Sequence, residues 1–529
     1  MLLGGLGLFI FGIEMNAEGL QKIAGSQMKK LMAKATRNRF TGALVGALTT
    51  AILQSSSFTT LMIAGLVNAN VLNITQAASL IIGANVGTTI TAQIIAFKIS
   101  SFALPMIALG VFLKFFTKSE RKIFIGDIIT GIGMLFLGLN LMQEAFLPLS
   151  SSLQFQTFLS NISDNFWMSI LSGFLLAALT QSSSASIGVI MALASTGMLE
   201  FESSIAMVLG ANVGTTLTTI IASMKMNYIA KRAAMLHILF NIGGVLMVIP
   251  FFKLFFFLVS KTISDPTNIL RGIANAHTLF NIITMCIFLV LLPWLVRTVS
   301  FIVPKKKTSS FGTPAFLQGY LKAPDIALMH VKIACVDMLK LTQTTLEFLS
   351  RYITGEEKYE GKILDNEYKI NTYRNKTSNY LAKIAGRNLT QSQAQSVPVL
   401  LHIVNDIETI GDQLKEMALE IKHMREKKLR FSRQDILQII GLCRDTNTHL
   451  NKLISLLGKS SRNHVIALEE ELINFRRDKL DQLKPKSSHF RFILRSFHNI
   501  TRKAVNLLVM TREVGRSDIV EDVKYEVFA

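Results

Sequence analysis

The feature that most constrains this chain is an internal repeat of two polar motifs, each embedded in apolar sequence. Gln54-Ser55-Ser56-Ser57 recurs as Gln181-Ser182-Ser183-Ser184, and Gly83-Ala84-Asn85-Val86-Gly87-Thr88-Thr89 recurs as Gly210-Ala211-Asn212-Val213-Gly214-Thr215-Thr216. Both motifs recur at the same offset, and a weaker match relates residues 7–12 to residues 133–138 at nearly the same offset. Because chance does not keep several motifs in register, we expect two copies of one structural unit.

The composition places these copies in a membrane. Half of the 529 residues are hydrophobic, and the first 300 positions hold 27 charged side chains, whereas the other 229 hold 63. Soluble domains carry about 25% charged residues, so we expect lipid around the first part and water around the second. A soluble enzyme, a fibrous chain and a wholly disordered chain are excluded. The net charge of +20 is explained by basic loops that set membrane topology, and no nucleic-acid partner is expected.

Two of the apolar stretches are too long, and too polar at their centres, to be single spans. A bilayer core needs about 20 apolar residues per helix. Stretches 40–67 and 166–197 exceed that length and contain the Gln-Ser-Ser-Ser motifs, so we predict broken helices or re-entrant hairpins there. Such segments are tolerated in a membrane only when protein buries them. The other stretches predict about seven spans, of which 102–116 must recruit flanking residues.

The charge of two equivalent loops predicts opposite orientations for the two copies. Residues 149–165 contain no basic residue and one acid, Asp164. The equivalent loop 22–39 contains no acid and the basic residues Lys22, Lys29, Lys30, Lys34, Arg37 and Arg39. The positive-inside rule places the basic loop in the cytoplasm and its counterpart outside. Equivalent loops on opposite faces mean inverted repeats, the architecture of many secondary transporters.

The sequence therefore predicts an all-α, polytopic membrane protein followed by a soluble helical domain. The membrane transport domain is expected over residues 1–300, with repeat 1 over about 1–122, repeat 2 over about 123–258 and an additional span at 272–296. Prolines punctuate a predicted linker over 301–324. From residue 325 to 529, apolar residues recur with the helical period, which predicts a cytosolic antiparallel bundle of two similar halves.

The duplicated motifs supply oxygens and donors without any fixed positive charge. Neutral oxygens suit Na⁺, and the N–H groups at a half-helix N-terminus, with serine hydroxyls, suit an anion. The candidate binding residues are Gln54, Ser55, Ser56, Ser57, Gln181, Ser182, Ser183 and Ser184, and the candidate supporting residues are Asn85, Thr88, Thr89, Asn212, Thr215 and Thr216. Helix packing is the alternative, above all for the Gly-x-x-x-Gly pairs within the second motif.

A further pair of polar residues lies downstream of the repeats. His237 and Asn241 share one helix face, as do His277 and Asn281, because each pair has the i, i+4 spacing. We expect interhelical hydrogen bonds from both pairs, with proton or ligand binding as the alternative. No nucleophile elbow or acid–base constellation accompanies the serines, so we expect no enzymatic activity.

The duplicated motifs resemble those of the bacterial sodium–phosphate cotransporter family, which is related to the animal type II sodium-dependent phosphate cotransporters. The resemblance extends over about residues 1–300. It implies Na⁺-coupled symport of inorganic phosphate across the plasma membrane, at a site formed by both inverted repeats. It also implies that the glutamine and serine residues line the phosphate and sodium sites, and that the asparagine and threonine residues support them.

The C-terminal part resembles a PhoU-like domain, a helical module associated with the regulation of phosphate transport. Glu408 and Asp412 place two carboxylates on one helix face, a geometry that suits a divalent metal. A salt-bridged helix face is the alternative. In the second half of the domain, His498 and Arg502 stand in place of the expected acids. The resemblance implies that this domain binds a cytosolic regulatory partner or forms a homo-oligomer.

Two other functions fit the same sequence. One is a phosphate exporter that uses the same site, because a coupled carrier runs down the combined gradient of ion and substrate and motifs do not set its direction. The other is a membrane-tethered sensor or scaffold for phosphate regulation. Coupling to protons in place of Na⁺, and transport of another tetrahedral oxyanion, are equally compatible with the motifs.

Overall fold

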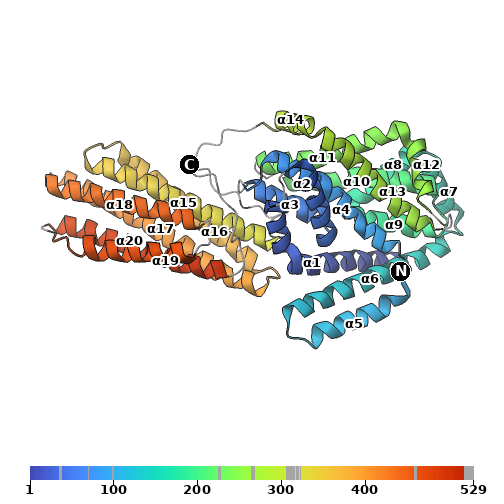
Figure 1. Cartoon of the computed structure of the whole chain (residues 1–529), viewed down its shortest axis with the longest axis horizontal. Coiled ribbons are helices and arrows are strands. Elements are labelled where there is room, and N and C mark those ends of the chain that lie inside the picture. Colours follow the sequence, from blue (N-terminus) through green and yellow to red (C-terminus); the bar gives the residue numbers. More distant parts are fainter. Residues whose placement is uncertain are drawn as a thin grey trace. The chain divides into compact units, whose positions relative to one another are not determined.

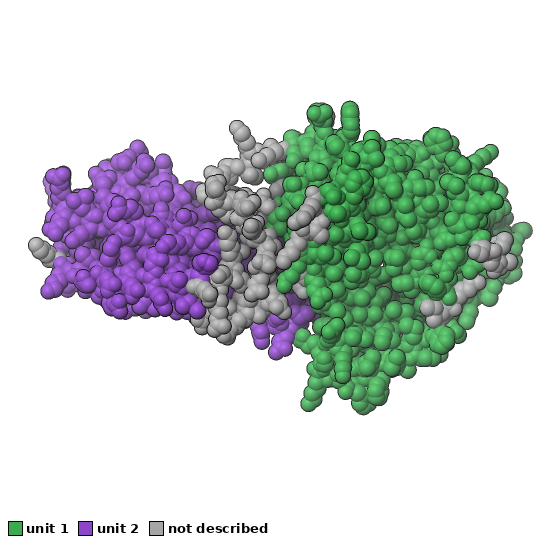
Figure 2. All heavy atoms as spheres, in the orientation of Figure 1, with its two compact units in different colours: residues 1–306 green, residues 307–529 purple. Residues whose placement is uncertain are grey.

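The chain forms two compact units, Met1–Lys306 and Lys307–Ala529, which Figure 2 shows in green and purple. The computed structural model describes residues 1–34, 38–68, 71–97, 100–223, 228–263, 268–304, 316, 321, 323–457, 462–485 and 487–516. Arg37 and most of the predicted linker 301–324 lie outside these residues. Every regular element within the described residues is a helix, which confirms the all-α prediction.

The helices of unit 1 follow the predicted membrane segments in order (Figure 1). They are α1 (Leu2–Lys34), α2 (Arg39–Leu53), α3 (Ser56–Asn68), α4 (Ile74–Ile95), η1 (Ser100–Phe102), α5 (Ala103–Phe115), α6 (Glu120–Leu149), α7 (Leu153–Ser163), α8 (Phe166–Thr180), α9 (Ser183–Ser195), α10 (Phe201–Ser223), α11 (Tyr228–Val248), η2 (Ile249–Phe251), α12 (Phe252–Lys261), α13 (Ile269–Val290) and α14 (Leu292–Ile302). Among the described residues, α4, α6, α13 and the run Lys231–Lys261 are each long and apolar enough to cross a membrane. Unit 1 is therefore a membrane domain.

Three segments differ from the prediction. The loop expected over 22–39 is mostly helix, because α1 continues to Lys34 and carries the basic residues on its C-terminal half. Its counterpart 149–165 contains α7, which meets α8 at an angle of 107°. The stretch 272–296 is interrupted at Leu291, after which α14 begins with a proline in its first turn, where the missing N–H costs nothing.

Helices α1 and α6 show the inversion of the two copies. A Cβ added at Gly5 would lie 3.0 Å from the carbonyl oxygen of Gly138, and one added at Gly12 would lie 2.6 Å from that of Gly131. Gly131 and Gly138 are the repeat equivalents of Gly5 and Gly12, so exchanging the copies exchanges these two contacts, as a two-fold axis requires. Residue numbers rise along α1 as they fall along α6, so the equivalent helices run antiparallel. The predicted inverted repeat is confirmed.

The first polar-centred stretch is a hairpin seated on α4. A Cβ added at Gly83 would lie 1.8 Å from the carbonyl oxygen of Ala43, and one added at Gly87 would lie 2.3 Å from that of Ala47. Numbers rise together along both helices, so α2 and α4 run parallel. The short helix α3 lies between them in the sequence and must carry the chain back, as predicted for a re-entrant hairpin. Asn38 caps α2 by accepting a hydrogen bond from the backbone N–H of Thr41 at 2.8 Å.

The second stretch repeats this arrangement in the other copy. A Cβ added at Gly210 would lie 1.9 Å from the carbonyl oxygen of Ile170, and one added at Gly214 would lie 2.3 Å from that of Phe174. Helices α8 and α10 are therefore parallel and in backbone contact, and α9 returns between them. The glycines of the second motif pack helices together, which confirms for them the alternative that the sequence left open.

Unit 2 is an antiparallel helical bundle. Its helices are α15 (Pro324–Ile353), α16 (Tyr359–Ala385), α17 (Gln391–Glu426), α18 (Arg433–Leu457), α19 (Arg462–Phe475), the π-helical turn η4 (Arg476–Leu480) and α20 (Ser488–Arg516). Helices α15, α16 and α17 pack on one another, and α17 packs along α20. At one end Glu360 of α16 accepts hydrogen bonds from Tyr352 of α15 at 3.1 Å and from Lys422 of α17 at 2.8 Å. The hydrogen bond from Lys422 lowers the pKa of the Glu360 carboxyl.

Replacing Gly83 by alanine should force α2 away from α4, since the added Cβ meets backbone that cannot move aside. We expect the thermal midpoint of the detergent-solubilised protein to fall by roughly 5 °C or more. Gly7→Ala is the matched control, because a Cβ at Gly7 meets nothing within 4 Å. Equal midpoints for the two variants would contradict the close packing of α2 on α4 at Gly83.

Candidate functional site

The two hairpin tips share one unusual backbone turn. Gln54 ends α2 with φ 55° and ψ 22°, and Gln181 ends α8 with φ 55° and ψ 20°. Non-glycine residues seldom adopt this left-handed conformation. The N–H of Gln54 donates to the carbonyl of Thr50 at 2.8 Å, and that of Gln181 donates to the carbonyl of Ala177 at 2.9 Å. The same residue therefore closes the same half-helix in both copies.

The serine after each glutamine begins the second half-helix. Ser55 Oγ accepts a hydrogen bond from the N–H of Phe58, and Ser182 Oγ accepts one from the N–H of Ala185, both at 3.2 Å. The next two N–H groups of each hairpin, at Ser56, Ser57, Ser183 and Ser184, have no hydrogen-bond partner within the described residues. Each tip thus presents free N–H groups at the positive end of a helix dipole, together with serine hydroxyls.

The two glutamine side chains occupy different surroundings. Gln54 is 8% exposed. Its Nε2 donates to the carbonyl of Ala51 at 2.8 Å, and its Oε1 accepts from the hydroxyl of Thr91 on α4 at 2.7 Å. Gln181 is exposed. The first tip is therefore fastened to α4, whereas the second glutamine is accessible, and the two copies are not equivalent in this conformation.

The threonines of the second motif donate to their own helices. Each hydroxyl donates to a backbone carbonyl three or four residues earlier: Thr88 to Ala84 at 3.0 Å, Thr89 to Val86 at 2.8 Å, Thr215 to Asn212 at 2.9 Å and Thr216 to Val213 at 2.7 Å. Three of these threonines are buried, and Thr215 is half-buried. A hydroxyl that donates to a carbonyl keeps its oxygen lone pairs, so these side chains can still accept a donor or contact a cation.

The asparagines of the second motif bond to other helices. Asn85 Nδ2 donates to the carbonyl of Ile81 at 3.0 Å, and its Oδ1 lies 3.2 Å from His237 Nε2 on α11. Asn212 Nδ2 donates to the carbonyl of Val208 at 3.0 Å, and its Oδ1 lies 3.2 Å from His277 Nε2 on α13. The expected interhelical hydrogen bonds of both histidines are confirmed.

A second polar network, at residues that the repeated motifs do not include, joins α4 to α13. Gln93 Nε2 donates to Asn275 Oδ1 at 3.2 Å and to the hydroxyl of Thr278 at 2.9 Å. Arg271 Nη1 donates to Gln93 Oε1 at 3.1 Å, and its guanidinium lies 4.5 Å from the ring centroid of Phe97. The available signal was a glutamine late in an apolar helix, outside both repeated motifs.

The predicted metal residues Glu408 and Asp412 lie on α17, near Glu367 of α16. Burial, with the charges of Glu408 and Glu367, raises the pKa of Asp412. Glu367 Oε1 already accepts from Lys415 at 2.9 Å and from Asn371 at 2.7 Å. Within the described ranges, no three His, Cys, Asp or Glu side chains are placed to hold a metal ion. The residues therefore do not fit the predicted divalent metal, and Lys415 supplies the local positive charge.

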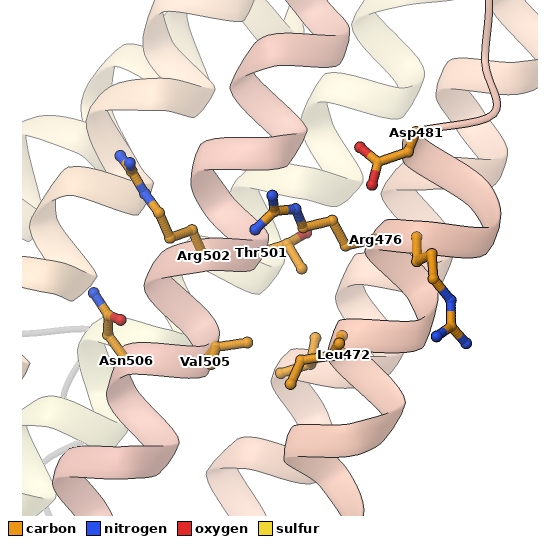
Figure 3. A pocket seen from close by; sticks show the side chains of 9 residues that line it. Leu472, Arg476, Asp481, Thr501, Arg502, Val505 and Asn506 are labelled. Carbon is orange, nitrogen blue, oxygen red and sulfur yellow. The ribbon is translucent and has the colours of Figure 1, made fainter.

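The second half of the bundle has basic residues near the corresponding position (Figure 3). A cavity of about 360 Å³ lies between α19–η4 and α20, and its lining includes Arg476, Arg477 and Arg502 against one acid, Asp481. Arg502 takes the place in the second half that Asp412 has in the first. This excess of positive charge opposes a divalent cation here as well.

Comparison with known families finds a match in each of the two units. Residues 8–144 and 147–290 match the Na⁺/Pi-cotransporter family, and residues 336–421 match the PhoU domain. The chain belongs to the Na⁺/Pi-cotransporter family. This is a family of phosphate transporters rather than enzymes, and the resemblance noted in the sequence is confirmed. The PhoU match covers the first half of the unit 2 bundle, where the acidic motif is retained.

Several relatives share parts of the chain. YqeW of Bacillus subtilis is 30% identical over 298 residues, which is 56% of this chain and 96% of that protein. YjbB of Escherichia coli, named for inorganic phosphate export, is 23% identical over 422 residues, or 79% of this chain and 77% of that protein. Human sodium-dependent phosphate transport protein 2B is 32% identical over 98 residues, or 18% and 14% of the two chains. No solved structure matches the chain.

Replacing Asp412 by asparagine should stabilise the full-length protein at neutral pH. The folded-state pKa of Asp412 lies above its unfolded value, so wild-type stability falls as the pH rises from the unfolded-state pKa through the folded-state pKa, and the variant lacks this loss. Thermal unfolding in detergent, with EDTA and with added Mn²⁺ or Mg²⁺, measures the effect, and the exposed Glu470→Gln serves as control. A midpoint below that of the wild type for Asp412→Asn in the presence of metal would instead support a metal site at Glu408 and Asp412.

Proposed function

We propose that this protein is a sodium-dependent inorganic phosphate transporter, a secondary active symporter of the plasma membrane. The carrying observation is the pair of hairpin tips. In each tip the carbonyl end of one half-helix and the N–H end of the next are separated by a turn at Gln54 or Gln181. Opposite partial charges side by side suit a cation and an anion bound together. Membership of the Na⁺/Pi-cotransporter family supports this substrate pair.

The residues divide between the two ligands by their chemistry. We assign phosphate to the free N–H groups of the last two serines of each motif and to the hydroxyls of Ser55–Ser57 and Ser182–Ser184. Na⁺ would be held by oxygens: the side-chain carbonyls of Gln54 and Gln181, the carbonyl ends of α2 and α8, and the threonine hydroxyls of the second motif. Neither motif contains Lys or Arg. Phosphate then brings an uncompensated charge into the bilayer unless Na⁺ enters with it, which is the physical basis of the coupling.

The orientation follows from basic residues at one end of unit 1. Arg39 Nη1 at the start of the first hairpin donates to the carbonyl of Leu289 at the end of α13, at 3.0 Å. Arg232 Nε near the start of α11 donates to the carbonyl of Val303 after α14, at 2.9 Å. We propose that this end is cytoplasmic, in accord with the positive-inside rule. The PhoU domain then lies in the cytosol, where it regulates transport through a protein partner or self-association.

Phosphate export is the second candidate. The relative YjbB, whose name describes export, aligns with 79% of this chain, beyond the membrane unit alone. The same site serves both directions, because the combined gradient of Na⁺ and phosphate sets the net flux. Radioactive phosphate flux in proteoliposomes, measured with inward and then outward Na⁺ gradients, distinguishes them. Flux that follows the Na⁺ gradient in both directions supports a coupled carrier, and flux that ignores it supports an uncoupled exporter.

Gln54→Asn and Gln181→Asn test the site without forcing a residue that rejects the left-handed turn, since asparagine tolerates it. Asparagine is one methylene shorter, so its amide no longer lies where the glutamine amide does. We therefore expect Na⁺-stimulated phosphate uptake to fall about tenfold or more. Uptake is compared in Na⁺, K⁺ and choline media. Gln154→Asn, at an exposed position on α7, is the matched control and should retain full uptake.

Failure of wild-type protein to move phosphate in any medium would favour the membrane-tethered sensor. Equal uptake by the Gln54, Gln181 and Gln154 variants would instead mean that the protein transports phosphate but that the two glutamines are not part of its binding site. Monodisperse elution of each variant before reconstitution separates these outcomes from misfolding.

A further inference from the structure

The two histidines occupy equivalent places in the inverted repeat, although they lie much closer together in the sequence than the two copies of the motifs do. His237 on α11 contacts Asn85 on α4, and His277 on α13 contacts Asn212 on α10. Asn85 and Asn212 are the same position of the repeated second motif. Helices α11 and α13 each pack against both α4 and α10. The two histidine contacts are therefore related by the same pseudo-two-fold axis as the hairpins.

Donors and acceptors in these contacts are fixed by the surrounding bonds. The Nδ2 of Asn85 donates within its own helix to the carbonyl of Ile81, so the atom facing His237 is the acceptor Oδ1. His237 must then carry its proton on Nε2, which leaves Nδ1 to accept. The hydroxyl of Thr219 on α10 lies 3.3 Å from that Nδ1. His237 thus holds α4 through one ring nitrogen and α10 through the other.

His277 lacks the second half of this arrangement. The position equivalent to Thr219 in the first repeat is Ala92, which has no hydroxyl. His277 is 1% exposed and Asn281 is 0% exposed, yet His277 Nδ1 and Asn281 Oδ1 have no hydrogen-bond partner among the residues that the structure describes. The two sites therefore differ by one hydroxyl, which Thr219 has and Ala92 lacks. The His277 contact joins α13 to α10 alone.

These contacts lie where the hairpins are seated. Asn85 is between Gly83 and Gly87, the two glycines that hold α2 against α4. Asn212 is likewise between Gly210 and Gly214, which hold α8 against α10. A histidine that fixes the asparagine also fixes the segment of helix on which a binding tip rests. The histidine itself need not touch phosphate or Na⁺.

We propose that His237 and His277 are positioning residues that set the packing of α4 and α10, and hence of the two hairpins, with unequal strength. His237 is a two-sided clamp between the repeats. His277 is a one-sided clamp, and its contact is the one that yields when the repeats move against each other. The effect on transport rests on the proposed function, whereas the hydrogen bonds and their consequence for stability do not.

The first test exchanges each histidine for glutamine or leucine. Glutamine can place a donor near the Nε2 position, whereas leucine fills similar volume without one. With rates expressed per reconstituted, monodisperse protein, we expect His237→Leu to lower the maximal rate of phosphate uptake about tenfold, with the phosphate KM changed less than about twofold. His237→Gln should recover most of that rate, and His277→Leu should cost less than His237→Leu. Glutamine and leucine variants of equal rate would overturn the proposal.

The second test alters the hydroxyl that distinguishes the two clamps. Thr219→Val removes it at nearly constant volume, and we expect a thermal midpoint about 3 °C lower. Ala92→Thr supplies the missing donor to His277, and Ala92→Val is its isosteric control. Relative to the valine variant, the threonine variant should be about 3 °C more stable and several-fold slower in transport.

The outcomes separate the possibilities. Stability and rate that move in opposite directions in Ala92→Thr support a clamp that must yield, whereas a gain in stability with an unchanged rate would reduce His277 to a packing residue. Identical midpoints for Ala92→Thr and Ala92→Val, together with an unaltered Thr219→Val, would overturn the unequal clamps. If wild-type protein shows no Na⁺-dependent flux, the proposed function fails, and the midpoints still decide whether the hydrogen bonds exist.

Discussion

A helix that stops inside a bilayer leaves N–H and carbonyl groups that lipid cannot satisfy, and unit 1 is organised around two such interruptions. Gln54 and Gln181 each close one half-helix by taking the left-handed backbone conformation, and the following serine caps the next half-helix. The glycines of α4 and α10 then bring a second backbone against one face of each hairpin. The free groups that remain are the ones that a ligand can use.

The two copies share a backbone plan, but equivalent side chains differ in burial and in residue type. Gln54 is 8% exposed, whereas Gln181 is exposed. Gln93 joins α4 to α13, whereas the equivalent residue on α10 is Ile220. An inverted repeat whose halves were identical in every contact would have inward-facing and outward-facing states of equal energy. Unequal contacts in equivalent places therefore bias the population toward one of the two states.

The sequence predicted the hairpins and the inversion because both leave local signals. Polar motifs in overlong apolar stretches mark interrupted helices, and the basic residues near Lys30 mark one membrane face. The pairing of His237 with Asn85 was not predictable in the same way, because the two histidines do not recur at the offset of the motifs. The role of Gly83 also needed the structure, since close packing and ligand approach both demand a missing side chain. Glu408 and Asp412 share a helix face as predicted. Lys415, three residues after Asp412, bonds to Glu367 of α16, and spacing along one helix does not reveal such a contact between helices.

For the proposed symport, the absence of lysine and arginine from the repeated motifs bears on how the site releases phosphate. A fixed cation would attract phosphate equally in the inward-facing and outward-facing states. Such an attraction cannot make phosphate bind on one side and dissociate on the other. A cation that dissociates behaves differently, because the anion is held only while its counterion is present. Serine hydroxyls and helix N-termini contribute partial charges, enough to orient phosphate but too weak to retain it alone. In the proposed symport, release of Na⁺ on one side lowers the affinity for phosphate on that side, so the ion gradient controls the movement of the anion.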